Sequence, residues 1–151
     1  MSAAGQFERG TDGPRVILVG VDGSPTSLRA AAYAAGLARR QHSRLVVVYV
    51  AEPATPMAGF VPAAHLAARD AAAQIGGELR RELRQAAEQL GIEADFRTAA
   101  GDPVGVLSRI ADELPADAVL VGASEKAGHR VVGSVAVRLV RVGRWPVTVV
   151  P

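Results

Sequence analysis

The sequence predicts an α/β fold in which a doubly wound, five-stranded parallel sheet of strand order 3-2-1-4-5 carries helices on both faces. Short apolar runs alternate with helix-like segments along the chain. The run Leu-Val-Val-Val-Tyr-Val at 45–50 is unbroken, as is typical of a strand buried on both faces of a parallel sheet. Parallel neighbours are joined by right-handed helical crossovers, so the alternation itself indicates this class of fold.

The chain is expected to begin with a flexible leader, residues 1–14, because this segment is small, polar and glycine-containing. A single domain over 15–151 follows, which is long enough to bury a core. Its first strand is predicted at 15–21. Ser24-Pro25 then provides an N-cap with proline at the first helical position, which predicts a helix over 25–41. The apolar face predicted for this helix consists of Leu28, Ala31, Ala32, Ala35 and Leu37.

The middle of the chain predicts a strand, a loop, a long helix and an edge strand. After the strand at 45–50, residues 52–62 contain three prolines and a glycine, which favours a mobile loop. A long helix runs from there to Leu90, with Gly91 as the residue that ends it. Residues 92–98 alternate between apolar and polar side chains, which is typical of a strand half open to water at a sheet edge.

The last third of the chain repeats the pattern of strand and helix. Asp102-Pro103 is a second cap followed by proline, and it predicts a helix to about residue 114. Strands are predicted at 117–121 and 146–150, with a helix over 134–143 between them.

Composition excludes several classes of function. The chain has no cysteine, so thiol catalysis, redox pairs and cysteine-based zinc sites are excluded. Its 3 histidines lie in different segments without a partner at i, i+4, so no metal site is expected. The leader lacks the apolar block of a signal peptide, and no apolar run is long enough to span a bilayer. We therefore expect a cytoplasmic protein with no membrane partner.

The loops exclude four common chemistries of doubly wound folds. The turn after the first strand, Gly-Val-Asp-Gly-Ser, lacks the G-x-G-x-x-G of dinucleotide-binding proteins, and no G-x-x-x-x-G-K-[ST] phosphate loop occurs. Gly122-Ala-Ser-Glu-Lys126 lacks the second glycine of a nucleophile elbow. A phospho-receiver domain would carry a carboxylate where this chain has Thr98-Ala-Ala-Gly101. No convincing nucleophile or general base remains, so we expect binding and no enzymatic turnover.

Two glycine-containing loops indicate one anion-binding site. Residues 20–24 follow the first strand and residues 122–134 follow the fourth, and each loop leads into a helix. Glycine lets the backbone approach a ligand closely, and the amides that open a helix can bind phosphate. In the predicted strand order the two loops are neighbours at the carboxyl edge of the sheet, where ligands of such folds bind.

Charged side chains in these loops have two interpretations each. Asp22 either braces its turn or accepts hydrogen bonds from a ribose or adenine, and its place at the end of a strand favours the second. Three cations of the second loop either belong to a solvated loop or are candidate phosphate contacts: Lys126, His129 and Arg130.

The last predicted helix carries three arginines at three-residue spacing toward its C-terminal end: Arg138, Arg141 and Arg144. Cations at that end stabilise the helix dipole, and we interpret the three in this way. The patch is small and lacks flanking aromatic side chains, and the net charge of the chain is only +2. No nucleic-acid partner is therefore expected.

Several motifs are specific when they are taken together. They are Val19-Gly-Val-Asp-Gly-Ser24, Gly101-Asp-Pro103, Ala116-Asp-Ala-Val-Leu-Val-Gly122, Gly133-Ser134-Val135 and Pro146-Val-Thr-Val-Val150. With these motifs the chain resembles the universal stress protein family over about residues 14–151. The resemblance implies an adenine-nucleotide alpha-hydrolase-like fold and a stress-response protein that binds ATP, AMP or cyclic AMP.

The nucleotide-binding members of this family resemble G-x2-G-x9-G-[ST] in the loop after the fourth strand. Here Gly122 and Gly133-Ser134 match the outer positions but lie eleven rather than thirteen residues apart, and Glu125 occupies the second glycine position. Glutamate disfavours a positive φ and brings negative charge toward phosphates. Gly128 is a candidate hinge in the shorter loop. The resemblance implies nucleotide contacts by Val21, Asp22, Val50, Val121, Gly122, Gly133, Ser134 and Val135.

Functions from different classes remain open at this point. The first is a stress-response protein that binds an adenine nucleotide, and the second is a nucleotide-independent dimeric interaction module, which Glu125 and the shortened loop favour. A small phosphoryl-transfer enzyme is a third. A homodimer is expected through the strand at 146–150, whose apolar edge is open, unless Pro146 and Pro151 keep the edge unpaired.

Overall fold

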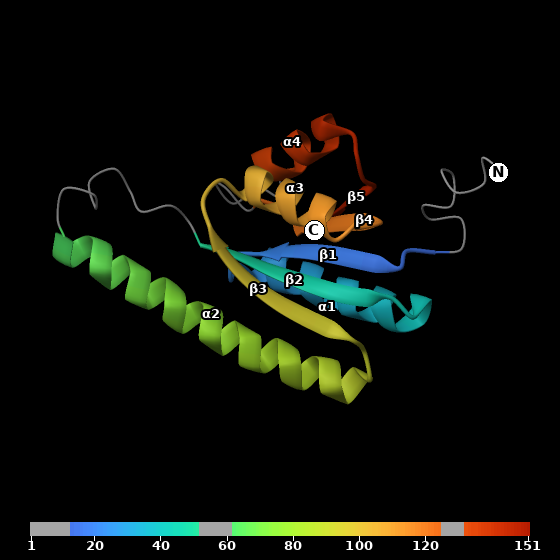
Figure 1. Cartoon of the computed structure of the whole chain (residues 1–151), viewed down its shortest axis with the longest axis horizontal. Coiled ribbons are helices and arrows are strands. Elements are labelled where there is room, and N and C mark those ends of the chain that lie inside the picture. The colour runs from blue at the N-terminus through green and yellow to red at the C-terminus, as the bar shows by residue number, and fades with distance from the viewer. Residues whose placement is uncertain (1–12, 52–61, 125–131) are drawn as a thin grey trace.

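The computed structural model describes residues 13–51, 62–124 and 132–151. Within these residues the chain forms five strands and four helices, which alternate along the sequence (Figure 1). Residues 1–12, 52–61 and 125–131 lie outside the described residues, and they include most of the predicted leader and all of the predicted loop at 52–62 except Pro62, which begins the long helix that follows.

All the predicted elements are present, and each observed boundary lies within two residues of the predicted one. β3 ends at Ala100 because Ala99 and Ala100 pair with Val50 and Ala51 of the neighbouring strand, although alanine gives little strand signal in a sequence. The elements are β1 (Val16–Val21), α1 (Pro25–Gln41), β2 (Arg44–Ala51), α2 (Pro62–Leu90), β3 (Ala94–Ala100), α3 (Pro103–Glu113), β4 (Ala118–Gly122), α4 (Ser134–Val142) and β5 (Val147–Val150).

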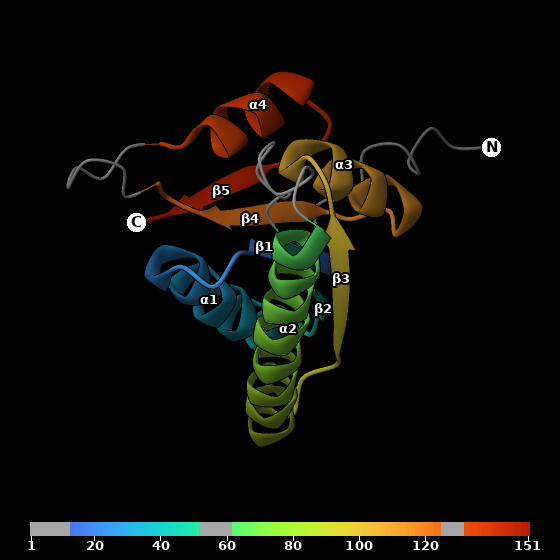
Figure 2. The ribbon, with the colours of Figure 1, turned by 90° about the vertical axis from the view of Figure 1, so that its left-hand side faces the viewer.

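The strands form one parallel sheet in the order β3-β2-β1-β4-β5, which confirms the predicted fold class. α3 and α4 cover one face of the sheet, and α1 and α2 cover the other (Figure 2). β3 lies at one edge of the sheet, as its alternating sequence predicted, and β5 lies at the other. β1 is central, so its carboxyl end lies between the ends of β2 and β4.

The sheet separates the core into two halves because successive side chains of a strand point to opposite faces. Leu18, Val46 and Val119 are fully buried in the half beneath α3 and α4. Val19 and Val47 are buried in the half beneath α1 and α2. This two-sided burial explains why the central strands are apolar at nearly every position.

The face that α1 buries agrees with the predicted one only in part, because Ala31 is buried and Ala35 and Leu37 are partly buried, while Ala32 is exposed. Ala30, Ala34 and Ala38 form its buried stripe, together with Ala31, while Leu28 is 39% exposed. Alanine occupies so many positions of this helix that the sequence does not define one apolar stripe. The small buried side chains let the axis of α1 lie close to the sheet.

α2 is the longest helix and buries little of its surface. Gly76, Leu79 and Ala87 are its buried residues, and its N-terminal part is largely exposed. None of the described helices combines the length and the apolar character that crossing a lipid bilayer requires.

Candidate functional site

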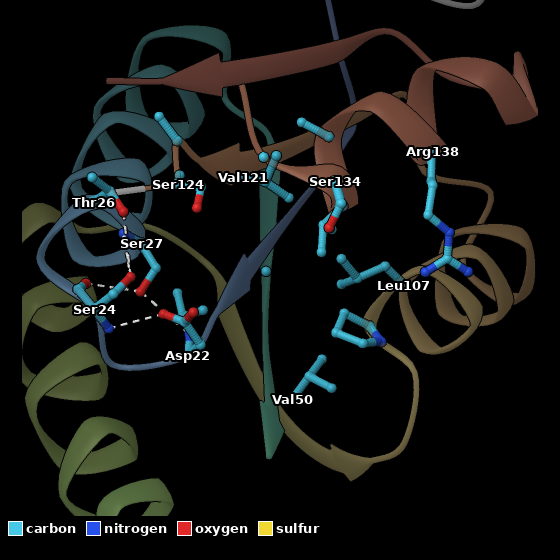
Figure 3. A pocket seen from close by; sticks show the side chains of 18 of the residues that line it. Asp22, Ser24, Thr26, Ser27, Val50, Leu107, Val121, Ser124, Ser134 and Arg138 are labelled. Carbon is cyan, nitrogen blue, oxygen red and sulfur yellow. Dashed lines mark hydrogen bonds between the residues drawn. The ribbon is translucent and has the colours of Figure 1, made fainter. Parts of the chain in front are cut away.

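A crevice of about 560 Å³ opens at the carboxyl edge of the sheet, where β1 and β4 end (Figure 3). All eight residues predicted to contact a nucleotide line it: Val21, Asp22, Val50, Val121, Gly122, Gly133, Ser134 and Val135. The structure therefore brings the first predicted loop and the described ends of the second to one place, while their contact with a nucleotide remains a prediction. The candidate phosphate contacts Lys126, His129 and Arg130 lie outside the described residues, as does Glu125.

One wall of the crevice is the turn from β1 into α1. The Asp22 carboxylate accepts a hydrogen bond from the amide of Ser24 at 2.8 Å, and the Asp22 amide donates to the Ser27 hydroxyl at 3.2 Å. That hydroxyl in turn donates to the carbonyl of Ser24 at 2.9 Å. Asp22 therefore braces the turn, as one of its two interpretations required. Its side chain is also exposed to the crevice, so the second interpretation is compatible with the same geometry.

The charge of Asp22 follows from these contacts. Burial raises the pKa of its carboxyl, but hydrogen bonds from the side chain and backbone of Ser24 and from Ser27 outweigh burial and lower the pKa below 3.8. The group is therefore ionised at neutral pH. An ionised carboxylate only accepts hydrogen bonds, so it suits a ligand that presents donors, such as the hydroxyls of a sugar.

The floor of the crevice is apolar. The last or next-to-last residues of three strands lie there with at most 6% of their surface exposed, namely Val21, Val50 and Val121, and Leu107 of α3 adds a fully buried side chain. Figure 3 shows Val50, Val121 and Leu107 between the Asp22 turn and α4. Small-molecule sites commonly combine such a floor with a few polar groups at the rim.

The opposite wall is the start of α4, which differs from the other helix starts that line the crevice. In α1 the Ser24 hydroxyl accepts from the Ser27 amide at 3.3 Å, and in α3 the Asp102 carboxylate accepts from the Gly105 amide at 2.9 Å. Both helices also begin with proline, which removes one amide donor. α4 has Gly133 as its N-cap, without a side-chain hydrogen bond, and begins with Ser134.

The amides at the start of α4 are consequently available to a ligand. The first bond of the helix runs from the amide of Val137 to the carbonyl of Gly133 at 3.1 Å. The preceding amides, those of Ser134, Val135 and Ala136, have no acceptor in the part of the chain that the structure describes. Unpaired amides at a helix N-terminus, where the helix dipole is positive, bind anions such as phosphate.

Gly133 lines the crevice and also packs closely against Ser124. A Cβ added at Gly133 would lie 2.9 Å from the Cβ of Ser124, which is closer than two carbons can approach. Its φ of −64° is one that any residue adopts, so contact with Ser124, and not backbone conformation, requires glycine here. The start of α4 thus packs directly on the residues that follow β4.

Sequence reasoning missed one charged pair at the rim. Arg138 of α4 donates two hydrogen bonds to the two carboxylate oxygens of Asp102, at 2.8 and 3.1 Å, and both residues line the crevice. The interpretation of Arg138 as a residue that stabilises the helix dipole is wrong, since it lies mid-helix. The sequence carried two signals for the pair: Asp102 follows β3 as Asp22 follows β1, and Arg138 lies one helical turn after Ser134.

The same interpretation fails for Arg144, which lies beyond the end of α4. Its guanidinium group donates to the Asp112 carboxylate at 2.7 Å and lies 5.0 Å from the centre of the Trp145 ring. Only Arg141 lies in the last turn of α4, as predicted.

The described residues of the crevice offer groups that can bind a ligand. Among the described residues that line the crevice, hydroxyl groups are present on Ser24, Thr26, Ser27, Ser124 and Ser134, but no histidine, lysine or cysteine accompanies them. In the same part of the chain, no cluster of three or more histidine, aspartate or glutamate side chains could hold a metal ion. The crevice can therefore bind a polar anionic ligand with an apolar portion.

A second hollow, of about 760 Å³, lies on the face of the sheet that α2 covers, between α2 and the ends of β2 and β3. Its α2 wall is mostly alanine and glycine, with His65, Arg69 and Arg80. The first residues of α2 do not line it, so it lacks a helix N-terminus of the kind found at α4.

Comparison with known proteins agrees with the geometry. Residues 14–151 match the model of the Universal stress protein family. A universal stress protein family structure from Burkholderia pseudomallei is 31% identical, with 91% of this chain and 96% of that chain covered and a TM-score of 0.72. A universal stress protein of Methanocaldococcus jannaschii is 28% identical over 137 residues, which are 89% of this chain and 80% of that protein. A universal stress protein solved in complex with cAMP is 24% identical, with 91% and 97% covered and a TM-score of 0.68.

Proposed function

Because the chain belongs to the universal stress protein family, we propose that this stress protein binds an adenine nucleotide in the crevice and does not turn it over. The observation that carries the proposal is the start of α4, where three successive residues line the crevice and their amides have neither a capping side chain nor an acceptor among the described residues. Such amides are the usual protein contribution to a phosphate site. ATP, AMP and cyclic AMP are the candidate ligands.

The walls of the crevice match the three parts of a nucleotide. The apolar floor of Val21, Val50 and Val121 accepts a base, since a base has two flat and weakly polar faces. The ionised carboxylate of Asp22 accepts hydrogen bonds from ribose hydroxyls. The amides and hydroxyl of Ser134 and its neighbours receive phosphate. A relative of the same fold was solved with cAMP, which supports a nucleotide of this class.

Substitutions at Ser134 test the role of the α4 amides. Ser134→Pro removes the first amide of the helix but no bond within it, because proline is favoured at the first helical position. The extended conformation of Gly133 is compatible with a following proline. Ser134→Ala is the matched variant, since it removes the hydroxyl and keeps the amide. Isothermal titration calorimetry with ATP, AMP and cyclic AMP then compares three proteins of similar stability.

We expect the wild-type protein to bind at least one of these nucleotides and Ser134→Pro to bind it more weakly than Ser134→Ala. A thermal shift offers a second measurement, because ligand at 100 times its Kd adds about 2.7 kcal/mol to the free energy of unfolding. If millimolar ATP, AMP and cyclic AMP give neither a heat of binding in calorimetry nor a rise in the unfolding temperature, the proposal is wrong. Equal binding by the two Ser134 variants would show that the amide of Ser134 does not contact the nucleotide.

A nucleotide-independent interaction module is the second candidate. It is favoured by Glu125, which stands where nucleotide-binding relatives carry glycine, and by the loop that is two residues shorter than theirs. Glu125→Gly separates the two functions. Nucleotide affinity rises in this variant if the loop is only a weakened phosphate site, whereas an interaction module binds no nucleotide in either form.

A further inference from the structure

Arg138 lies beside the proposed phosphate site and not on a remote part of α4. It is four residues after Ser134, so the two side chains share one face of the helix. Long side chains of a helix lean toward its N-terminus, which places the guanidinium group on the side of the free amides. Both residues line the crevice, and Figure 3 shows them on the same wall.

Asp102 holds that guanidinium group in the structure. Arg138 bonds both carboxylate oxygens, and one of these oxygens also accepts the amide of Gly105 to cap α3. The hydrogen bonds from Arg138, followed by the one from Gly105, lower the pKa of Asp102, so its charge is fixed at neutral pH. Asp102 therefore adds a second carboxylate to the rim of a site that is proposed to receive an anion.

The pair is open enough to be broken by a stronger anion. The side chains of Arg138 and Asp102 are 51% and 50% exposed, and ion pairs with this exposure contribute little to stability. A phosphate group carries more charge than a carboxylate, and its oxygens match the two-pronged geometry of a guanidinium group equally well. A phosphate at the start of α4 would thus compete with Asp102 for Arg138.

We propose that Arg138 is a phosphate-binding residue of the crevice, which Asp102 holds in the unliganded protein and which transfers to the phosphate of the bound nucleotide. This inference rests on the proposed function and deepens it. Arg138 then determines the preference of the site for phosphorylated over unphosphorylated adenosine. Asp102 opposes binding because it competes for the same guanidinium group.

Substitutions of Arg138 and Asp102 should therefore change the affinity for AMP and ATP in opposite directions. Arg138→Gln removes the cation, so affinity for AMP and ATP falls by about tenfold, the equivalent of one charged hydrogen bond, while affinity for adenosine does not fall. Asp102→Asn removes the competitor and keeps a side chain that caps α3 well, so affinity for AMP and ATP rises. Arg141→Gln is the control, because it makes the same change of charge on the same helix at a residue that does not line the crevice.

Calorimetry of these four proteins with adenosine, AMP and ATP is the test. The proposed transfer of Arg138 from Asp102 to phosphate is supported if affinity for AMP and ATP falls in Arg138→Gln, rises in Asp102→Asn and stays near the wild-type value in Arg141→Gln. If both variants lose affinity alike, the pair only ties α3 to α4 and Arg138 does not bind phosphate. If Arg138→Gln behaves as Arg141→Gln does while the wild type binds AMP, this inference is wrong and the proposed function stands. A wild-type protein that binds none of the three ligands overturns both.

Discussion

Gly122 lies so close to Thr26 that a Cβ added to the glycine would stand 2.5 Å from the carbonyl carbon of Thr26. The atoms it would meet belong to the backbone of the first turn of α1. The end of β4 and the start of α1 therefore touch along their main chains. Glycine was predicted here so that a backbone could approach a ligand, but the neighbour that requires it is the protein itself.

Replacing Gly122 should therefore destabilise the fold whether or not a nucleotide is present. Gly122→Ala forces the backbone of α1 away from β4, and overpacking of this kind costs about 1–3 kcal/mol or more. Urea denaturation measures the loss. Gly77→Ala is the matched control, because nothing lies within 4 Å of its Cβ position in α2 and alanine is the better helix former by about 1 kcal/mol. Equal stability of Gly122→Ala and wild type would contradict the packing argument.

The sequence predicted the fold in detail because each element carries a local signal. Ser24-Pro25 and Asp102-Pro103 begin helices as caps followed by proline, and the apolar runs fix the buried strands. The contacts between residues of the crevice carry no such local signal. Asp102 and Arg138 are 36 residues apart, and their pairing depends on how α3 and α4 lie against each other, which no local pattern specifies. The proximity of Gly122 to Thr26 is equally a property of packing.

Replacing Asp22 separates its role in the turn from its role toward a ligand. Asp22→Asn keeps an oxygen that accepts the amide of Ser24, so the turn should keep its shape, and stability at neutral pH should fall only by what the negative charge adds to these hydrogen bonds. It removes the negative charge, so affinity for adenosine should fall by about tenfold, because hydrogen bonds to charged groups are the stronger ones. Calorimetry with adenosine and urea denaturation measure the two effects. If Asp22→Asn binds adenosine as the wild type does but is less stable, Asp22 braces the turn and does not contact the ligand.

Acid should weaken the fold through the carboxyls of Asp22 and Asp102. Hydrogen bonds hold the pKa values of both carboxyls below the usual value of an aspartate in the folded protein. A group whose pKa is lowered on folding contributes stability above its unfolded pKa, and the contribution disappears as pH falls through the folded value. We therefore expect the stability difference between wild type and Asp102→Asn to be constant from pH 7 to about pH 5 and to shrink below about pH 4.

Urea midpoints measured from pH 7 to pH 2.5 would test this, with Asp70→Asn as a control for loss of one exposed carboxylate from α2. Salt should reduce the neutral-pH difference, because the pair with Arg138 is exposed. A difference between wild type and Asp102→Asn that does not vary with pH would show that the charge of Asp102 contributes nothing to stability.

Within the described ranges β5 has no partner strand on its outer edge, and we predict a homodimer through this edge that a single proline should dissociate. The carbonyls of Pro146 and Val150 accept hydrogen bonds from β4 and from the residue that follows it, so in an extended strand the backbone groups of Val147 and Val149 face the outer edge of the sheet. Val149→Pro removes an amide from that edge and none from the pairing with β4, which is where a strand tolerates proline. Val149→Ala is the matched variant, since it loses the same packing but keeps the amide. Light scattering at micromolar concentration should give a dimer for wild type and Val149→Ala and a monomer for Val149→Pro. A monomeric wild type, or a Val149→Pro dimer, would mean that β5 does not pair across its edge.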